Sequence, residues 1–170
     1  VRSSDFFRPA NIRWARYIQL DWERRAEFLG MGHAWPKPDP IVQDLTTFEI
    51  AKEQPHIFRL SKLGVEAHRK GRGIEFAYEV AHLIFGGTRD WDKGTNLANA
   101  VARAGLDLTE MDAVIQQGDH LTEIEQNQDA LDESGHWGVP TFVFQDEPFF
   151  GQDRLDLLRW TLDRAGVAKS

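Results

Sequence analysis

The segment from residue 138 to residue 158 constrains the fold of this chain more than any other part of its sequence. It begins Gly-Val-Pro-Thr-Phe-Val-Phe, continues through a short polar stretch to Pro-Phe-Phe, and ends Gly-Gln-Asp-Arg-Leu-Asp-Leu-Leu. This pattern predicts a strand, a tight turn, a second short strand, and a glycine that leads directly into a helix. Pro140 has no N–H and cannot lie centrally in a ladder, so it indicates a special turn where the first strand begins.

A cis peptide bond between Val139 and Pro140 is expected at this turn, because a cis proline is usually a feature of a tight turn. Such a turn would leave the backbone N–H and C=O of Val139 free to pair with an extended ligand. The alternative is an ordinary β-hairpin packed under a helix, since short motifs carry a false-positive risk.

The same segment closely resembles the end of the thioredoxin-like proteins of the DsbA superfamily. The specific match is to the branch of 2-hydroxychromene-2-carboxylate isomerase and the kappa-class glutathione transferases. It rests on Gly-Val-Pro-Thr at 138–141 and on Phe-Gly-Gln-Asp-Arg-Leu at 150–155, the part that plain thioredoxins lack. More weakly, residues 17–30 and 100–108 resemble helices of that branch's inserted helical domain. The resemblance implies an α/β protein with a thioredoxin-like fold and a large inserted helical domain, here mostly helix plus one C-terminal β-hairpin.

The resemblance also implies how the chain is divided. It assigns residues 9–135 to the inserted helical subdomain and residues 136–170 to the C-terminal part of the thioredoxin-like domain. The family begins with a strand, a loop that carries a catalytic Ser or a Cys-x-x-Cys, a helix and a second strand, and these have no counterpart here. Because a βαβ unit takes about 30 residues or more, we expect a fragment whose nucleophile lies in the missing N-terminal part. The alternative is a protein that has lost its nucleophile.

Four residues of the C-terminal segment are the expected glutathione-binding residues, carried over from the resemblance. Val139 and Pro140 would hold the cysteinyl part of glutathione, and Gln152 and Asp153 its γ-glutamyl end. The chemistry is compatible, because the unpaired N–H groups at a helix start favour an anion and the Asp153 carboxylate could receive an amino group. The alternative is that Gln152 or Asp153 caps the last helix.

Three further residues could line a substrate pocket, whereas the catalytic residue itself stays unknown. Trp14 stands where the family has a lysine, and one of the nearby residues Asn11, Arg13 and Arg16 could replace it. His136 precedes the proline turn, so it could act as an acid or base near neutral pH. Core packing for Trp14 and an ordinary loop position for His136 are the alternatives. The six histidines show no spacing typical of a metal site, so no metal is expected.

Composition narrows the classes of partner and compartment. The sequence contains 20 Lys and Arg and 27 Asp and Glu, so its net charge is −7. This negative charge disfavours nucleic acid and anionic membranes as binding partners. No apolar run is long enough to span a bilayer. The sequence contains no Cys, so these residues hold no disulfide and no thiolate nucleophile. We expect a small-molecule substrate, neither nucleic acid nor membrane as partner, and a cytoplasmic location, and leave a homodimer open.

Apolar periodicity predicts a helix-rich chain. Helices are expected over residues 11–29, 57–69 and 120–134, with others around 76–84 and 97–104, after 107 and after 155. Residues 46–49 fit a capping box and predict one more short helix, which Pro55 would break.

Three functions are compatible with this reading. The first is a glutathione-dependent isomerase or transferase that acts on aromatic-derived or unsaturated acids through a transient adduct. The second is a DsbA-like thiol–disulfide oxidoreductase, which would require a Cys-x-x-Cys in the missing part. The third is a non-catalytic thioredoxin-like binding protein.

Overall fold

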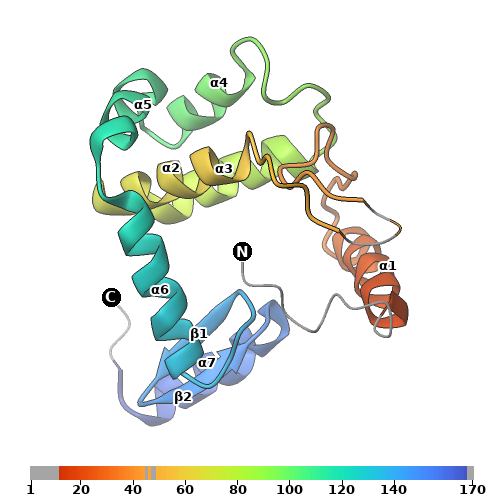
Figure 1. Ribbon diagram of the computed structural model, residues 1–170. Coiled ribbons are helices and arrows are strands. Elements are labelled where there is room, and N and C mark those ends of the chain that lie inside the picture. Colours follow the sequence, from red (N-terminus) through yellow and green to blue (C-terminus); the bar gives the residue numbers. More distant parts are fainter. Residues whose placement is uncertain (1–11, 45, 47–48, 168–170) are drawn as a thin grey trace. The chain divides into compact units, whose positions relative to one another are not determined.

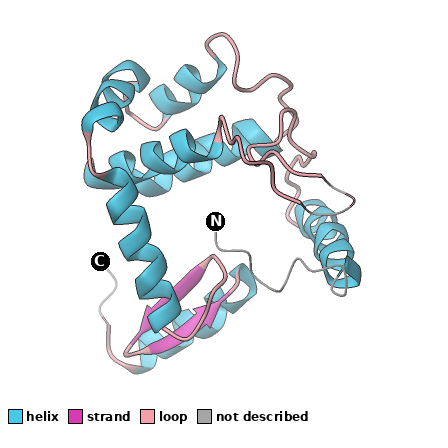
Figure 2. Cartoon of the chain, in the orientation of Figure 1, coloured by secondary structure: helices cyan, strands magenta, loops and turns pink. Residues whose placement is uncertain are grey.

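The computed structural model describes residues 12–44, 46 and 49–167, and in them the chain forms helices and one β-hairpin (Figure 1, Figure 2). The chain divides into two compact units, residues 1–120 and residues 121–170, here called the N-terminal unit and the C-terminal unit. The expected limits of an inserted subdomain, 9 to 135, stay a prediction, because compactness alone does not show which segment is an insertion.

The N-terminal unit is helical in its described part. Its helices are α1 (Ile12–Phe28), α2 (Ile57–Arg69), α3 (Gly73–Phe85), α4 (Asn96–Arg103) and α5 (Leu108–Gln117). Helix α2 contacts α3 and α5, and α4 contacts the same two helices, so these four enclose a common core. Figure 1 shows α2 and α3 running side by side.

The core consists of the apolar stripes that the helical periodicity predicts. On α3, the side chains of Phe76, Val80, Leu83 and Ile84 recur at helical spacing and are all buried. Residues three and four positions apart share one face of a helix, so a stripe of this kind packs against its neighbours as a unit. The other buried core residues are Leu63, Ala67, Trp91, Leu97, Ala100, Val101, Ala104, Met111 and Ile115.

Local signals fix the start of α5. Asp107 has an extended backbone, and its side chain accepts a hydrogen bond from the backbone N–H of Glu110 at 2.9 Å. This bond satisfies one of the N–H groups that a helix start leaves unpaired. The helix that the sequence predicts after residue 107 is confirmed.

The segment between α1 and α2 is irregular, and the prediction of a short helix there is wrong. Residues 49–54 are not helical, and Gln43 pairs instead with Ile50 in an isolated antiparallel bridge. The Gln54 side chain closes this loop, because it accepts from the N–H of Val42 at 2.9 Å and donates to its carbonyl at 2.8 Å. These two bonds pair the backbone N–H and C=O of Val42 with a side chain, so this loop is held in an extended conformation without helical hydrogen bonds. Two residues of the capping pattern, 47 and 48, lie outside the described residues.

The C-terminal unit contains the hairpin. Its elements are α6 (His120–Glu133), which begins at the last residue of the N-terminal unit, β1 (Thr141–Phe144), β2 (Glu147–Phe150), the 3-10 helix η3 (Gln152–Arg154) and α7 (Leu155–Arg164). The two strands pair antiparallel, with Phe142 opposite Phe149. Gln145 and Asp146 connect them with φ angles of 51° and 64°, which is the backbone of a two-residue type I′ turn. The predicted strand, tight turn, strand and helix are all confirmed.

Ion pairs cross the outer faces of the helices in the N-terminal unit. Arg59 of α2 donates to Asp112 of α5 through two nitrogens at 2.8 and 2.6 Å, and Lys70 lies 2.6 Å from Glu110. Such exposed pairs contribute little stability each, so the apolar core is the main source. Among the helices of the described residues, none combines the length and apolar character that crossing a lipid bilayer demands.

Candidate functional site

The turn before β1 has the predicted geometry. The Val139–Pro140 peptide bond is cis, and Val139 is 79% exposed. Within the described part of the chain, neither the backbone N–H nor the C=O of Val139 has a hydrogen-bond partner. Both groups are therefore available to an extended ligand.

The ladder between β1 and β2 determines which way these backbone groups face. The N–H of Gly151 donates to the carbonyl of Pro140 at 2.9 Å, so residues 140, 142 and 144 of the first strand face the second. The alternate residues, Val139, Thr141 and Val143, turn their N–H and C=O groups to the opposite edge. In the described residues, no further strand pairs with this edge of the hairpin.

The same ladder joins the predicted binding residues in space. Because Pro140 pairs with Gly151, the proline turn and the residues that follow Gly151 lie at the same end of the hairpin. Val139 thus lies one residue before the pair, and Gln152 and Asp153 follow directly after it. The hairpin brings together all four residues expected to bind glutathione.

Asp153 lies in η3, directly before α7, without occupying the N-cap position of either helix. The N-cap residues of η3 and α7 are Gly151 and Arg154, and neither supplies a side-chain cap hydrogen bond. Asp153 Oδ2 lies 3.3 Å from an Arg154 guanidinium nitrogen in a pair that is exposed to solvent. The other oxygen, Oδ1, lies close to Gly151, because a Cβ atom added to Gly151 would come within 2.5 Å of it. The carboxylate is therefore directed toward the proline-turn end of the helix.

An aromatic cluster lies beside the turn. The ring of His136 stacks on Phe150 with centroids 4.1 Å apart, and Trp137 lies 6.3 Å from the same ring. Gly138 permits this contact, because a Cβ there would come within 2.5 Å of the Phe150 ring. His136 accepts the N–H of Gly138 through Nδ1 at 2.9 Å, so the proton of the neutral ring is on Nε2. That N–H is the donor that His136 can offer to a ligand.

The rest of the expected substrate pocket is not tested. Asn11 lies outside the described residues, and Trp14 lies in α1, where its side chain is not described. Both belong to the N-terminal unit, whereas His136 belongs to the C-terminal unit. A pocket formed by these three residues stays a prediction. Among the described residues, no three His, Asp or Glu side chains converge on a point where they could hold a metal ion.

Comparison with known families decides the class of this protein. The family model of the DSBA-like thioredoxin domain matches residues 11–163, nearly the whole chain. The chain belongs to the DSBA-like thioredoxin family. The thioredoxin-like fold inferred from the proline turn and the terminal helix is thereby confirmed, as is the DsbA-superfamily resemblance.

A solved structure of the same fold agrees with this DSBA-like assignment. It is the selenomethionine form of a 2-hydroxychromene-2-carboxylate isomerase, and it is 18% identical in sequence. The match has a TM-score of 0.63 and covers 91% of this chain and 71% of that chain. At this level of identity the likeness shows the fold. A search of curated proteins finds no significant match to the chain.

Some residues of the site in this DSBA-like protein were not found from the sequence. The sequence identifies Phe150 only as part of a motif, yet its ring forms one side of the aromatic cluster with His136 and Trp137. Gly138 was likewise a motif residue, and its role is to make room for that ring. No sequence signal identifies these contacts, because the hairpin register that brings residue 150 next to the start of β1 comes from the structure.

Proposed function

We propose that this protein is a glutathione-dependent isomerase or transferase that acts on aromatic-derived or unsaturated acids. The observation that carries the proposal is the hydrogen bond between Pro140 and Gly151, because it holds the free backbone of Val139 beside Asp153. Membership of the DSBA-like family and the fold shared with 2-hydroxychromene-2-carboxylate isomerase support a thioredoxin-like isomerase or oxidoreductase. A cytoplasmic location is part of the same hypothesis.

In this proposal the hairpin and the helix start hold the two ends of the tripeptide. The N–H and C=O of Val139 pair with the backbone of the cysteinyl residue, as a strand edge pairs with an extended peptide. The Asp153 carboxylate receives the ammonium group of the γ-glutamyl residue. The γ-glutamyl carboxylate lies at the N–H groups of the helix start next to Gln152, where the helix dipole favours an anion.

In the proposed chemistry the thiolate of the bound glutathione attacks the substrate, whereas the catalytic residue of the protein that would activate this thiol stays unknown. Its sulfur adds to an unsaturated carbon of the acid, and the electron pair of the double bond moves onto the conjugated carbonyl group. Rotation about the resulting single bond follows, and the electron pair then returns and expels the thiolate. Glutathione is regenerated and no oxidant is needed. His136 can donate a hydrogen bond from Nε2 to the oxygen that becomes negatively charged.

Calorimetric titration of the purified protein with reduced glutathione tests the binding step. Asp153→Asn should weaken binding by about 1–3 kcal/mol, the range for a hydrogen bond to a charged group. Asp156→Asn is the matched control, because Asp156 is an exposed carboxylate in the first turn of α7. Equal dissociation constants for wild type and Asp153→Asn would exclude this site. The reaction is tested by following 2-hydroxychromene-2-carboxylate by absorbance, and turnover that does not depend on glutathione would contradict the proposal.

Thiol–disulfide exchange is the second candidate, because the family description is that of a DSBA-like domain. The 170 residues contain no Cys, so exchange would require two thiols outside them. Thiol titration of the denatured intact protein decides the matter. Two titratable thiols together with reduction of insulin would favour the oxidoreductase. Glutathione binding without either activity would favour the third possibility, a non-catalytic binding protein.

A further inference from the structure

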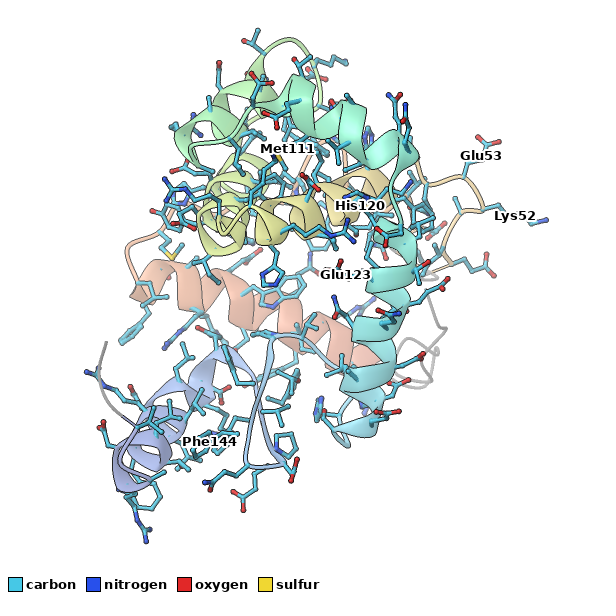
Figure 3. All side chains as sticks on the ribbon, turned by 90° about the vertical axis from the view of Figure 1, so that its left-hand side faces the viewer. Lys52, Glu53, Met111, His120, Glu123 and Phe144 are labelled. Carbon is cyan, nitrogen blue, oxygen red and sulfur yellow. The ribbon has the colours of Figure 1, made fainter. Side chains whose placement is uncertain are left out.

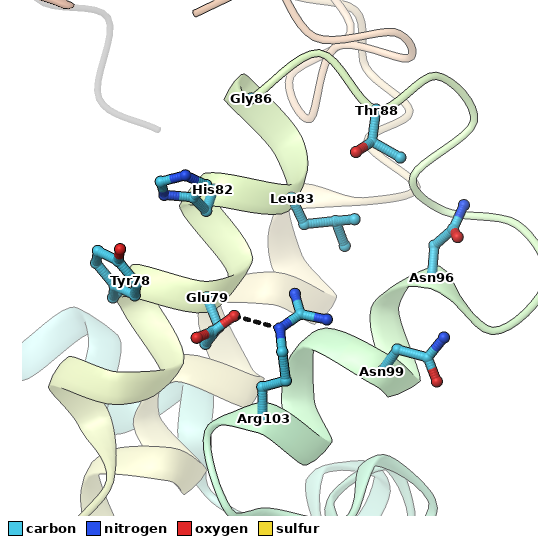
Figure 4. A pocket seen from close by; sticks show the side chains of 9 residues that line it. All are labelled: Tyr78, Glu79, His82, Leu83, Gly86, Thr88, Asn96, Asn99 and Arg103. Atoms are coloured by element: carbon cyan, nitrogen blue, oxygen red, sulfur yellow. Dashed lines mark hydrogen bonds and ion pairs between the residues drawn. The ribbon is translucent and has the colours of Figure 1, made fainter. Parts of the chain in front are cut away.

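A groove lies between α3 and α4, entirely within the N-terminal unit (Figure 4). Its volume is about 480 Å³, inside the range of about 300–1,000 Å³ that is typical of small-molecule sites. Leu83 forms part of its floor, and this side chain also belongs to the buried core that holds α3 against α4. The walls are mostly polar side chains, so the groove suits a hydrophilic molecule.

An arginine is held in place across this groove. The Nε atom of Arg103, on α4, donates to Oε2 of Glu79, on α3, at 2.6 Å (Figure 4). Glu79 is only 22% exposed, so the bond fixes the guanidinium at one wall. Among the described residues, the two terminal nitrogens of Arg103 have no hydrogen-bond partner, and Figure 4 shows them turned away from Glu79. A free pair of guanidinium N–H groups matches the two oxygens of a carboxylate.

The opposite part of the groove offers hydrogen-bond acceptors. The amide nitrogen of Asn96 donates to the carbonyl of Asp90 at 3.1 Å, and that of Asn99 donates to the Thr95 hydroxyl at 3.3 Å. Each of these bonds uses one of the two amide hydrogens, so the Oδ1 atom and the second N–H of each amide stay available to a ligand. Oxygen acceptors of this kind bind the hydroxyl groups of a ligand.

We propose that the α3–α4 groove binds a small hydroxylated carboxylate, with its carboxylate on the terminal nitrogens of Arg103 and its hydroxyls on Asn96 and Asn99. A carboxylate fits better than a phosphate because Glu79 offsets the charge of the single arginine. A phosphate dianion would be repelled by that carboxylate. The site lies on a different unit from the proline turn, and the inference does not depend on the proposed glutathione chemistry.

Gluconate is a suitable probe, because it combines one carboxylate with several hydroxyls. We expect gluconate to shift the backbone amide resonances of residues 79–103 in two-dimensional NMR spectra of the full chain. Arg103→Gln should raise the gluconate dissociation constant about tenfold or more, the cost of a charge-assisted hydrogen-bond pair. Arg103→Lys should recover only part of the affinity, because a lysine lacks the paired N–H groups. Arg159→Gln is the matched control, since it removes the same charge from an exposed position on α7.

Two further ligands and one variant test the assignment of the groups. Acetate, which has no hydroxyls, should bind more weakly than gluconate, and Asn99→Ala should lower the affinity for gluconate but not for acetate. Equal affinity of wild type and Arg103→Gln for gluconate would overturn the proposal. Binding of glucose 6-phosphate without binding of gluconate would overturn the choice of a carboxylate. Arg103 is about half exposed, so circular dichroism should show that its variants fold normally.

Discussion

The Nε2 atom of His120, which is labelled in Figure 3, lies 3.0 Å from Oε2 of Glu66, and both side chains are buried. His120 is the first residue of α6 and the last residue of the N-terminal unit, and Glu66 lies in α2, so this contact lies within that unit. Lys70 Nζ lies 3.8 Å from the other oxygen of Glu66. The second ring nitrogen of His120, Nδ1, is buried and has no hydrogen-bond partner among the described residues. Among the described residues, Glu66 therefore supplies the hydrogen bond that the buried imidazole makes.

Replacing Glu66 should destabilise the N-terminal unit. In Glu66→Leu the N–H of His120 would be buried without an acceptor, at a cost of about 1–3 kcal/mol in the free energy of unfolding. Glu66→Gln keeps an acceptor and should cost less. Urea denaturation followed by circular dichroism measures both. Glu125→Leu, at an exposed position on α6, is the control for removal of a carboxylate. Equal stabilities of the Glu66→Leu and Glu125→Leu variants would show that the buried contact contributes nothing.

Gly118 should not tolerate a side chain, because the ring of His120 occupies that space. A Cβ at residue 118 would come within 2.4 Å of the ring, and Glu66 prevents the ring from moving away. Gly118→Ala should therefore lose about 1–3 kcal/mol of stability, the usual range for overpacking. Gly32→Ala is the control, since the nearest atom to its new Cβ lies 4.0 Å away. In a His120→Ala background the loss at Gly118 should largely disappear, and a loss of unchanged size would contradict the steric explanation.

The helices could be predicted from the sequence because their signals are local. The stripe from Phe76 to Ile84 and the cap at Asp107 each lie within one helical segment and predict its position without knowledge of the fold. Contacts between distant residues were not predictable in this way. Gln54 bonds with Val42 twelve residues away, and that pairing replaces the helix that the capping box at 46–49 suggested. The capping pattern is only a weak local preference for a helix. Hydrogen bonds with residues outside the pattern determine the conformation of this segment.

The sequence predicts those residues of the candidate sites that lie in a motif. It does not predict those that become neighbours only through packing. Val139 and Asp153 lie in two motifs close together in sequence, so the resemblance identified both. The register of the hairpin, which joins the motifs through Pro140 and Gly151, had to come from the structure. The α3–α4 groove has no sequence motif, because its residues become neighbours only when α3 packs on α4.

The carboxyl group of Asp119 should titrate below its ordinary range. Arg69 donates a hydrogen bond to Asp119 Oδ1 at 2.8 Å, and this bond is the main cause that lowers the pKa of Asp119, followed by a backbone hydrogen bond and the attraction of the same guanidinium. A lowered pKa in the folded state stabilises the fold above the ordinary pKa, and this stabilisation is lost as the pH falls through the folded value. In Arg69→Gln the pKa of Asp119 should rise, as measured by NMR titration. Arg59→Gln, which removes a separate ion pair with Asp112, should leave it unchanged.

Pro148 should keep the outer edge of β2 from pairing with another strand. Because residues 140, 142 and 144 face β2 and Pro148 stands opposite Val143, the nitrogen of Pro148 lies on the outer edge. A proline there offers no N–H donor, which blocks strand addition. Pro148→Val restores the donor and should increase self-association in sedimentation velocity experiments. Glu147→Val is the control, because the backbone of residue 147 faces β1. Equal sedimentation of both variants would rule out a protective role for the proline.

Gly151 should be required for the direction of Asp153 as well as for the turn. Its φ of 97° and ψ of 151° are open almost only to glycine, and a Cβ would come within 2.5 Å of Asp153 Oδ1. Gly151→Ala should therefore lower stability by about 1–3 kcal/mol through backbone strain and also displace the carboxylate. Gly166→Ala separates the two effects, because Gly166 has a φ of 71° and no atom within 4 Å of a new Cβ. Both variants should unfold at a lower urea concentration, but only Gly151→Ala should bind reduced glutathione more weakly in calorimetry. An unchanged glutathione affinity in folded Gly151→Ala would mean that the position of the Asp153 carboxylate does not matter for binding.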